Sequence, residues 1–304
     1  MAEALPNPKP TALSGPELLK DASWFDANWP LISTLLCPVA FVLPFVLCQL
    51  PGRAAIRHPY VLGWLTIAFY LCHQTEEHGY DLRGWRYAFV PDFNHGTGAW
   101  LFKECEKIGH RTCPADPRMA TYINVVTVWG GFTFCMLCAH HLGGRYAYAG
   151  FCNWGMSVIN ALTGHLIPWM LVGYNPGAFQ SIFMCLFGIY ALSRVGKFFA
   201  WTCIVHGLAF HGGLRQICLG ICTNLVLKAH WPVETYAVLC FIFSTAVPLA
   251  VAKLFAPDAP KESLDERFHF AVCLYHFAYR GCFIQKPYAR PLQTISILCK
   301  VLNC

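Results

Sequence analysis

Apolar runs alternate with short polar segments along most of the chain. A helix needs about 20 mostly apolar residues to cross a bilayer, and a backbone inside the bilayer must be helical unless strands close into a barrel. The pattern therefore predicts an all-α polytopic transmembrane bundle of six to eight membrane helices. The expected spans are residues 29–50, 60–78, 119–142, 147–173, 178–193 and 232–255, with one kinked span or two half-helices at 198–227 and an interfacial helix or further span at 268–283.

The same pattern divides the chain into three regions: a polar N-terminal tail at 1–28, the transmembrane bundle at 29–256, and an amphipathic segment with a basic tail at 257–304. Composition agrees, because 56% of the residues are hydrophobic and 12% are charged, against about 25% charged in soluble domains. The net charge of +6 is spread over loops and the tail, which argues against nucleic-acid binding. We expect a multi-pass integral membrane protein, with an endomembrane location favoured.

Four ionisable residues end the second apolar run, in the segment His73-Gln74-Thr75-Glu76-Glu77-His78. Carboxylates and imidazoles at membrane depth are costly unless they are paired, bind a metal or face a polar cavity, so they mark a functional site by default. On a helix, His73, Glu76 and Glu77 stand at positions i, i+3 and i+4 and share one face. This face predicts a metal site or an acid–base pair.

The chain resembles the HXXEE family of multi-pass membrane proteins over roughly residues 30–195. Three pieces carry the resemblance, in this order: His73-x-x-Glu76-Glu77, then Asn160 with His165, then Tyr174-Asn175-Pro176-Gly177. The resemblance implies a helical membrane fold and a site built from these residues, more than it implies a substrate.

The direction of the spans predicts that these pieces meet. The second and fourth spans run in the same direction, so Glu76 and Glu77 at the end of one and His165 in the last third of the other lie near the same membrane face. The third span starts from that face, which brings Tyr122 and Asn124 to a similar level. One polar chamber can therefore collect all of these side chains.

Two chemistries are open for this chamber. In the first, His73, Glu76, Glu77 and His165 bind a divalent metal ion, as carboxylates and imidazoles from facing helices do in other bundles. In the second, the adjacent glutamates share a proton, because two carboxylates in an apolar chamber do not both ionise cheaply, and the four residues act as acid and base. Asn160, Tyr174 and Arg83 are the candidate substrate-binding residues.

We expect an integral-membrane enzyme that acts on a hydrophobic small molecule, a lipid or isoprenoid, by isomerase-, cyclase- or hydrolase-like chemistry. Three alternatives remain. The polar residues can form a structural network with Arg83 or Arg86; they can serve a proton- or cation-coupled transporter or a lipid-binding protein; or His73–His78 and His206–His211, both of the form HX4H, can belong to a di-iron hydroxylase or desaturase. The last alternative lacks an HXXHH box.

The chain has 17 cysteines. Most lie singly in apolar runs, where cysteine acts as a small apolar residue; these include Cys37, Cys72 and Cys240. Cys135 and Cys138 form a CxxC pair within an apolar run, for which we expect packing rather than zinc or redox chemistry. Cys105 and Cys113 lie in a polar loop and are left open as a disulfide pair.

Overall fold

A computed structural model describes residues 18–48, 52–95, 115–211 and 217–258. The chain divides into two units, Met1–Leu264 and Asp265–Cys304, and all the described residues belong to the first. Within them every regular element is helical, and Tyr80 and Arg86 form an isolated β-bridge. The expected segment at 268–283 and the Cys105–Cys113 pair lie outside the described residues.

Three of the described helices contain π-helical segments. In order, the described helices are α1 (Trp24–Cys48), α2 (Gly52–Ala55), α3 (Pro59–Gln74) continuing as η1 (Thr75–Gly79), α4 (Phe89–His95), α6 (Pro117–Thr121) continuing as η2 (Tyr122–Phe132) and α7 (Thr133–Leu142), η3 (Gly144–Tyr148), α8 (Gly150–Ile159) continuing as η4 (Asn160–Leu166) and α9 (Ile167–Val172), α10 (Ala178–Ser193), α11 (Lys197–His211), α12 (Ile217–Lys228), α13 (Thr235–Ser244) and α14 (Ala246–Phe255).

Four helices in the described part of the chain are long and apolar enough to cross a membrane: Trp24–Cys48, Pro117–Leu142, Gly144–Val172 and Thr235–Phe255. They agree with four of the expected spans, although α1 begins at Trp24 rather than at residue 29. The described residues do not confirm the expected count of six to eight. The expected spans at 60–78, 178–193 and 198–227 are not among the four: α3 continues into the polar segment η1, α10 has only 16 residues, and residues 198–227 include the short helices α11 and α12.

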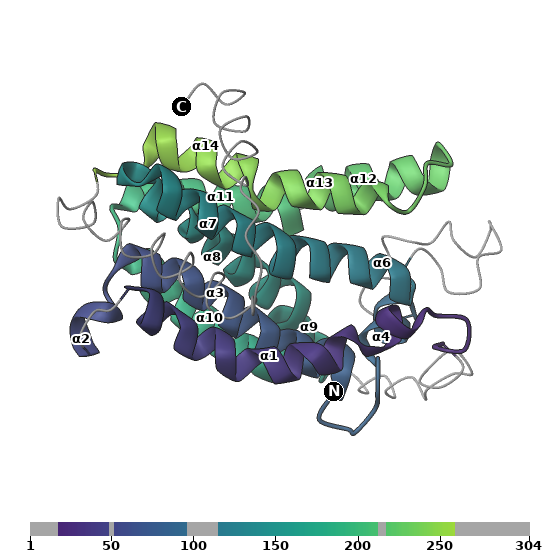
Figure 1. The fold of residues 1–304 in the computed structure, drawn as a ribbon. Helices are drawn as coiled ribbons and strands as arrows, with labels where there is room; N and C mark the ends of the chain where they lie inside the picture. Colours follow the sequence, from purple (N-terminus) through teal and green to yellow (C-terminus); the bar gives the residue numbers. More distant parts are fainter. Residues whose placement is uncertain (1–17, 49–51, 96–114, 212–216, 259–304) are drawn as a thin grey trace, which may run out of the picture. The chain divides into compact units, whose positions relative to one another are not determined.

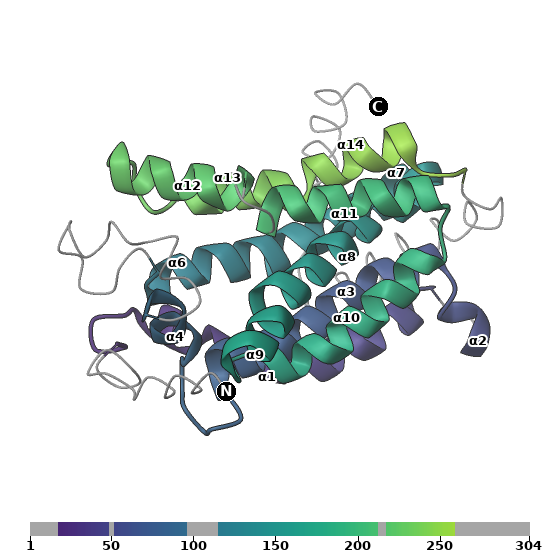
Figure 2. The ribbon, with the colours of Figure 1, turned by 180° about the vertical axis from the view of Figure 1, so that it is seen from behind.

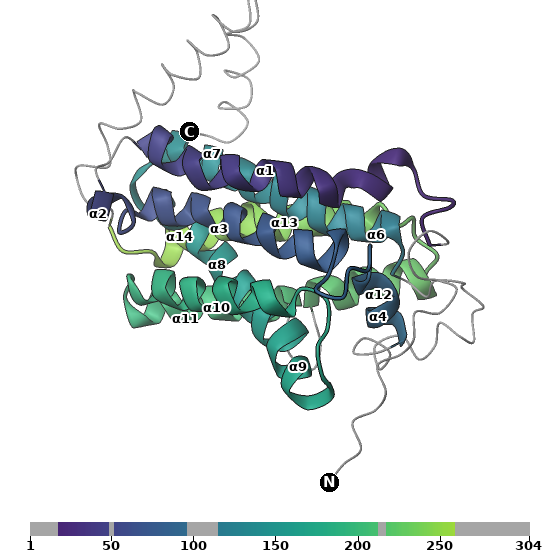
Figure 3. The same ribbon diagram turned by 90° about the horizontal axis from the view of Figure 1, so that it is seen from below.

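The helix α3–η1 is the centre of the first unit. It packs against α1, α8 and α10, and Figure 1 shows it beside α1. Viewed from behind in Figure 2, α10 and α11 lie in front of α3 and α8, and Figure 3 shows α3 between α1 and α10. Almost every side chain from Pro59 to Leu71 is buried. This burial explains why a run that ends in four ionisable residues is enclosed by protein.

The helices α8 and α11 approach closely because glycines face each other. A Cβ atom added to Gly155 would overlap the backbone carbonyl of Cys203, and one added to Gly207 would overlap the backbone of Gly155. Small residues at helix interfaces allow such contacts in membrane proteins, where packing drives helix association. The contact fixes α8, and with it the start of η4, against α11.

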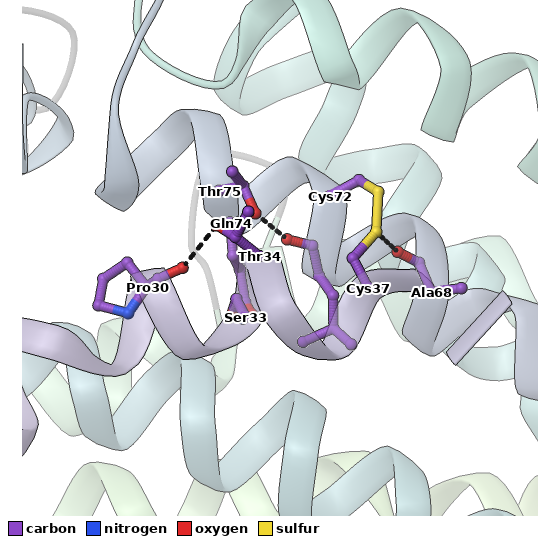
Figure 4. Close-up of a disulfide and its surroundings, with 9 residues drawn as sticks. Pro30, Ser33, Thr34, Cys37, Ala68, Cys72, Gln74 and Thr75 are labelled. Atoms are coloured by element: carbon purple, nitrogen blue, oxygen red, sulfur yellow. Dashed lines mark hydrogen bonds between the residues drawn. A yellow bond between two sulfur atoms is a disulfide. The ribbon is translucent and has the colours of Figure 1, made fainter. Parts of the chain in front are cut away.

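A disulfide joins α1 to α3 through Cys37 and Cys72, whose Cα atoms are 6.0 Å apart. The prediction that these two cysteines serve only as small apolar residues is therefore wrong. Figure 4 shows the bond together with polar contacts one or two turns away on the same two helices. The Thr34 hydroxyl donates to the Thr75 hydroxyl at 3.2 Å, and Ser33 donates to Gln74 Oε1 at 3.2 Å. Since Cys72 precedes His73, these contacts hold the end of α3 where the ionisable residues begin.

Candidate metal centre

Three π-helical segments converge on the ionisable residues of the HXXEE pattern. The segment η1 carries Glu76, Glu77 and His78, η2 carries Asn124, and η4 carries Asn160 and His165. π-Helices make up well under 1% of residues in globular proteins and often occur at functional sites, since a wider turn redirects side chains. Their presence on three facing helices marks this region as the candidate site.

Glu77 lies at the centre of the site, among three imidazoles. Its Oε2 atom is 3.4 Å from His73 Nε2 and 3.3 Å from His78 Nε2, and its Oε1 atom is 3.5 Å from His165 Nε2. Glu77 is 5% exposed, and the three histidines are at most 1% exposed. The structure thus brings His73, Glu77 and His165 together, from α3, η1 and η4.

The partners of the Nδ1 atoms fix which nitrogen of each imidazole faces Glu77. His73 Nδ1 is 3.1 Å from the carbonyl oxygen of Gly177, and His165 Nδ1 is 2.8 Å from Asn175 Oδ1. The Asn175 amide is itself oriented, because its Nδ2 donates to the backbone oxygen of His165. Both Nδ1 atoms therefore carry the proton. In the neutral rings, both Nε2 atoms direct a lone pair at the Glu77 carboxylate.

Lone pairs and carboxylate oxygens repel one another unless a proton or a cation lies between them. A hydrogen bond between a charged imidazole and a carboxylate has a length of about 2.7–2.9 Å, shorter than the 3.4 and 3.5 Å seen here. In a tetrahedral site with bonds of about 2.0–2.1 Å, ligand atoms lie about 3.3–3.4 Å apart. The two contacts, one to each oxygen of the carboxylate, are longer than direct hydrogen bonds and leave room for a metal ion among the three side chains.

The donor set has the composition of a catalytic zinc site. One ligand atom each from His73, Glu77 and His165 lies within 4.8 Å of the others. Two histidines and one glutamate, with a fourth position open to water or substrate, are one of the ligand sets of catalytic zinc. The contacts from Gly177 and Asn175 match the rule that a metal-binding histidine donates its other N–H to a backbone or side-chain oxygen.

Glu76 has a different role from Glu77. Its carboxylate accepts hydrogen bonds from the backbone N–H groups of Phe179 and Gln180, at 3.2 and 2.7 Å, and from the Tyr174 hydroxyl at 2.8 Å. The first two donors belong to the first turn of α10, where unpaired N–H groups and the helix dipole favour an anion. The prediction that Glu76 is a metal ligand is not supported. Glu76 instead anchors the loop that presents Gly177 and Asn175 to the histidines.

The predicted substrate-binding residues lie at different depths. Asn160 Nδ2 is 3.3 Å from His73 Nε2 and 3.1 Å from the Tyr70 hydroxyl, so it borders the metal set. Tyr174 contacts Glu76 and accepts a hydrogen bond from the Leu82 backbone at 3.0 Å. Burial raises the pKa of Tyr174 above its usual range, which keeps its hydroxyl a donor to Glu76.

Arg83 does not contact either glutamate through any hydrogen bond or ion pair in the described residues. Its Nε donates to Asp81 at 2.7 Å, and its guanidinium stacks on Trp85 at 4.1 Å and lies 5.4 Å from the Tyr174 ring. No such contact therefore supports a structural network between Arg83 and the two glutamates. Arg83 instead packs beside the Tyr174 ring.

Two residues at the site were not predicted from the sequence. Tyr70 lies one turn before His73, with its ring edge-on to the His73 ring, and its i, i+3 spacing from His73 was a usable signal. His211 ends α11 and lies 3.4 Å from the Tyr70 hydroxyl. Nothing in the local sequence could have shown that α11 ends there, because the placement depends on the packing of α8 against α11.

Of the histidines of the di-iron alternative, His73 and His78 lie beside Glu77, but His206 does not join them. His206 is 3.2 Å from the Cys152 carbonyl oxygen and 2.7 Å from that of Phe243, which ties three helices together. His140 stacks on Tyr60 and accepts a hydrogen bond from Trp64 at 2.9 Å. Among the described residues, these imidazoles serve interhelical contacts.

The separate roles of the two glutamates give a test. We expect Glu76→Gln to lower the free energy of unfolding by about 1–2 kcal/mol, the range for charge-assisted hydrogen bonds and a helix terminus, while metal still binds at saturation. Thermal unfolding in detergent and metal titration measure the two effects. If Glu76→Gln removed the metal without lowering stability, Glu76 would be a ligand after all.

Comparison with known proteins shows one family that matches part of the chain. Residues 64–192 match the family described as "Protein of unknown function with HXXEE motif". No curated protein and no solved structure matches the chain. The matched segment contains the three candidate ligands, the anchoring Glu76 and the loop from Tyr174 to Gly177. The part of the chain that builds this site is therefore similar to the HXXEE-motif family.

Proposed function

We propose that the protein is a metal-dependent integral-membrane hydrolase of a lipid-like substrate. The observation that carries the proposal is the pair of imidazole lone pairs, from His73 and His165, held toward the Glu77 carboxylate at distances that suit a shared ion. Isomerase or cyclase chemistry needs only a protonated acid. A two-histidine, one-glutamate set with an open position is instead the arrangement that metal-assisted hydrolysis uses.

A bound divalent ion would polarise a carbonyl or phosphoryl oxygen and lower the pKa of water to near neutrality. The protein's own residues position the reacting groups. Asn160 Nδ2 lies 3.3 Å from His73 Nε2 and would be available to donate a hydrogen bond to a substrate oxygen. The Tyr70 hydroxyl, between Asn160 and His211, is the nearest group that can pass a proton. The burial of Glu77 and the histidines would limit the access of bulk water to a bound ion.

The surroundings favour an apolar substrate. The helix α9 follows η4 directly, and its residues Met170 and Leu171 are each 77% exposed. Figure 3 shows α9 projecting beyond α10. An exposed apolar helix that begins two residues after His165 suits a chain lying in the bilayer, where lipid tails contact it. We propose a multi-pass protein of an endomembrane, with the described apolar helices as its membrane anchor.

A lipid-release assay tests the proposal. Full-length protein in detergent, incubated with a mixed membrane-lipid extract, should release hydrolysis products that mass spectrometry detects. Treatment with a strong chelator should stop the release, and zinc should restore it. His141→Ala, at an exposed histidine of α7, is the control and should retain activity. Release at an unchanged rate after chelation would overturn the hydrolase. Metal-dependent cation uptake into proteoliposomes without lipid turnover would favour the transporter alternative instead.

A further inference from the structure

A second group of metal-binding side chains lies on helices that do not contribute ligands to the histidine–glutamate centre. Cys218 and Cys222 are four residues apart on α12, and Cys240 lies on α13. The two helices pack against each other, as Figure 1 shows. The three sulfur atoms all lie within 4.8 Å of one another, and each residue is at most 1% exposed.

This arrangement differs from that of the other buried cysteines. Cys185 on α10 is buried without two further cysteines, histidines or carboxylates at ligand distance within the described residues. Packing alone explains such a single thiol, because cysteine behaves as a small apolar residue. Three thiols from two helices directed at one point satisfy the spacing of a coordination site instead.

The three sulfur donors favour particular metal ions. Thiolates are soft ligands that favour Cu(I), zinc and iron–sulfur clusters. Structural zinc sites almost always have four ligands, and the described residues supply three, all of them sulfur. A three-sulfur set therefore suits Cu(I) better. The Thr223 and Tyr236 hydroxyls, 2.9 Å apart, are the neighbouring polar pair on the same two helices.

We propose that Cys218, Cys222 and Cys240 form a Cu(I)-binding site, separate in its residues and in its metal preference from the centre around Glu77. Each thiol that binds releases its proton to solvent, and the copper enters and remains as Cu(I), so no electron acceptor or donor is needed. The proposal does not depend on the hydrolase activity.

Competition with a chromophoric Cu(I) chelator under anaerobic, reducing conditions tests the site on the full-length protein in detergent. The wild type should bind about one more equivalent of Cu(I) than Cys222→Ala/Cys240→Ala does. A matched variant, Cys138→Ala/Cys185→Ala, removes two thiols outside the cluster and should bind as wild type. X-ray absorption should show sulfur as the neighbour of the copper lost in the cluster variant.

Folding and selectivity are checked in the same samples. Cys218→Ala alone gives a milder change and should also lose the equivalent, with an elution profile like that of wild type. The cluster variants should retain a divalent ion at the Glu77 centre, whereas Glu77→Gln should retain Cu(I). Equal Cu(I) binding by the cluster and matched variants would overturn the proposal. Nitrogen or oxygen neighbours around the copper that the cluster variant loses would also overturn it.

Discussion

Glu77→Gln should abolish metal binding and hydrolysis while leaving the fold intact. Gln keeps the shape of the side chain but lacks the negative charge that would hold a cation beside His73 and His165. Changes in the residues behind metal ligands typically cost 10–100-fold in affinity or activity, and loss of a ligand should cost more. We expect the rate to fall by at least about 10²-fold, with metal content near zero. Elemental analysis and the lipid-release assay measure both quantities.

The control for this variant is stability. A carboxylate held among imidazoles without a metal would be a structural network, and removal of one member of such a network is strongly destabilising. The metal account expects Glu77→Gln to insert into the membrane and to elute as one species in detergent. Aggregated or poorly expressed Glu77→Gln protein, together with unchanged specific activity in the folded fraction, would favour the structural network.

Gly177→Ala should weaken metal binding although residue 177 has no ligand atom. Gly177 has a φ of +90°, and a Cβ atom there would lie 2.7 Å from His73 Cε1 and 2.9 Å from His165 Cε1. The methyl group therefore has to displace both ligand rings, and the Gly177 carbonyl that orients His73 would shift with them. We expect an affinity loss of about 10–100-fold, the range for disturbed outer contacts, measured by metal titration.

Gly173→Ala is the matched control for that substitution. Gly173 lies in the same loop with a φ of +99°, but a Cβ atom there meets no other atom within 4 Å. Both variants carry a similar backbone strain of about 1–3 kcal/mol, and only Gly177→Ala crowds the histidines. An equal loss of metal affinity in the two variants would show that loop strain alone is responsible.

The sequence predicted that the main candidate ligands lie together, because helical spacing and the direction of two spans were sufficient. The i, i+4 spacing of His73 and Glu77 places them on one helix face, and the shared direction of two apolar runs brings His165 to the same end. The sequence did not separate Glu76 from Glu77. Adjacent residues on a helix point about 100° apart, and which of them faces the histidines depends on the packing of η1 against α10.

The sequence predicted which segments form apolar helices better than it predicted where those helices end or how far protein encloses them. Hydropathy predicted four apolar helices that the structure bears out, but it could not show that α3 is enclosed by protein. Hydropathy alone does not distinguish helices that face lipid from those that face protein. The Cys37–Cys72 disulfide was missed for a related reason: the sequence has 17 cysteines, and pairing requires knowledge of which helices are adjacent.

The metal content of the purified full-length protein tests the central claim most directly. After expression in metal-supplemented medium and purification without chelators, elemental analysis should find about one divalent ion per chain, and X-ray absorption should show nitrogen and oxygen neighbours. The ion should be absent from His73→Ala, Glu77→Gln and His165→Ala, and present in His141→Ala and in Cys222→Ala/Cys240→Ala. Folded wild-type protein that binds no divalent ion even when titrated, or a divalent ion that persists in all three ligand variants, would contradict the account.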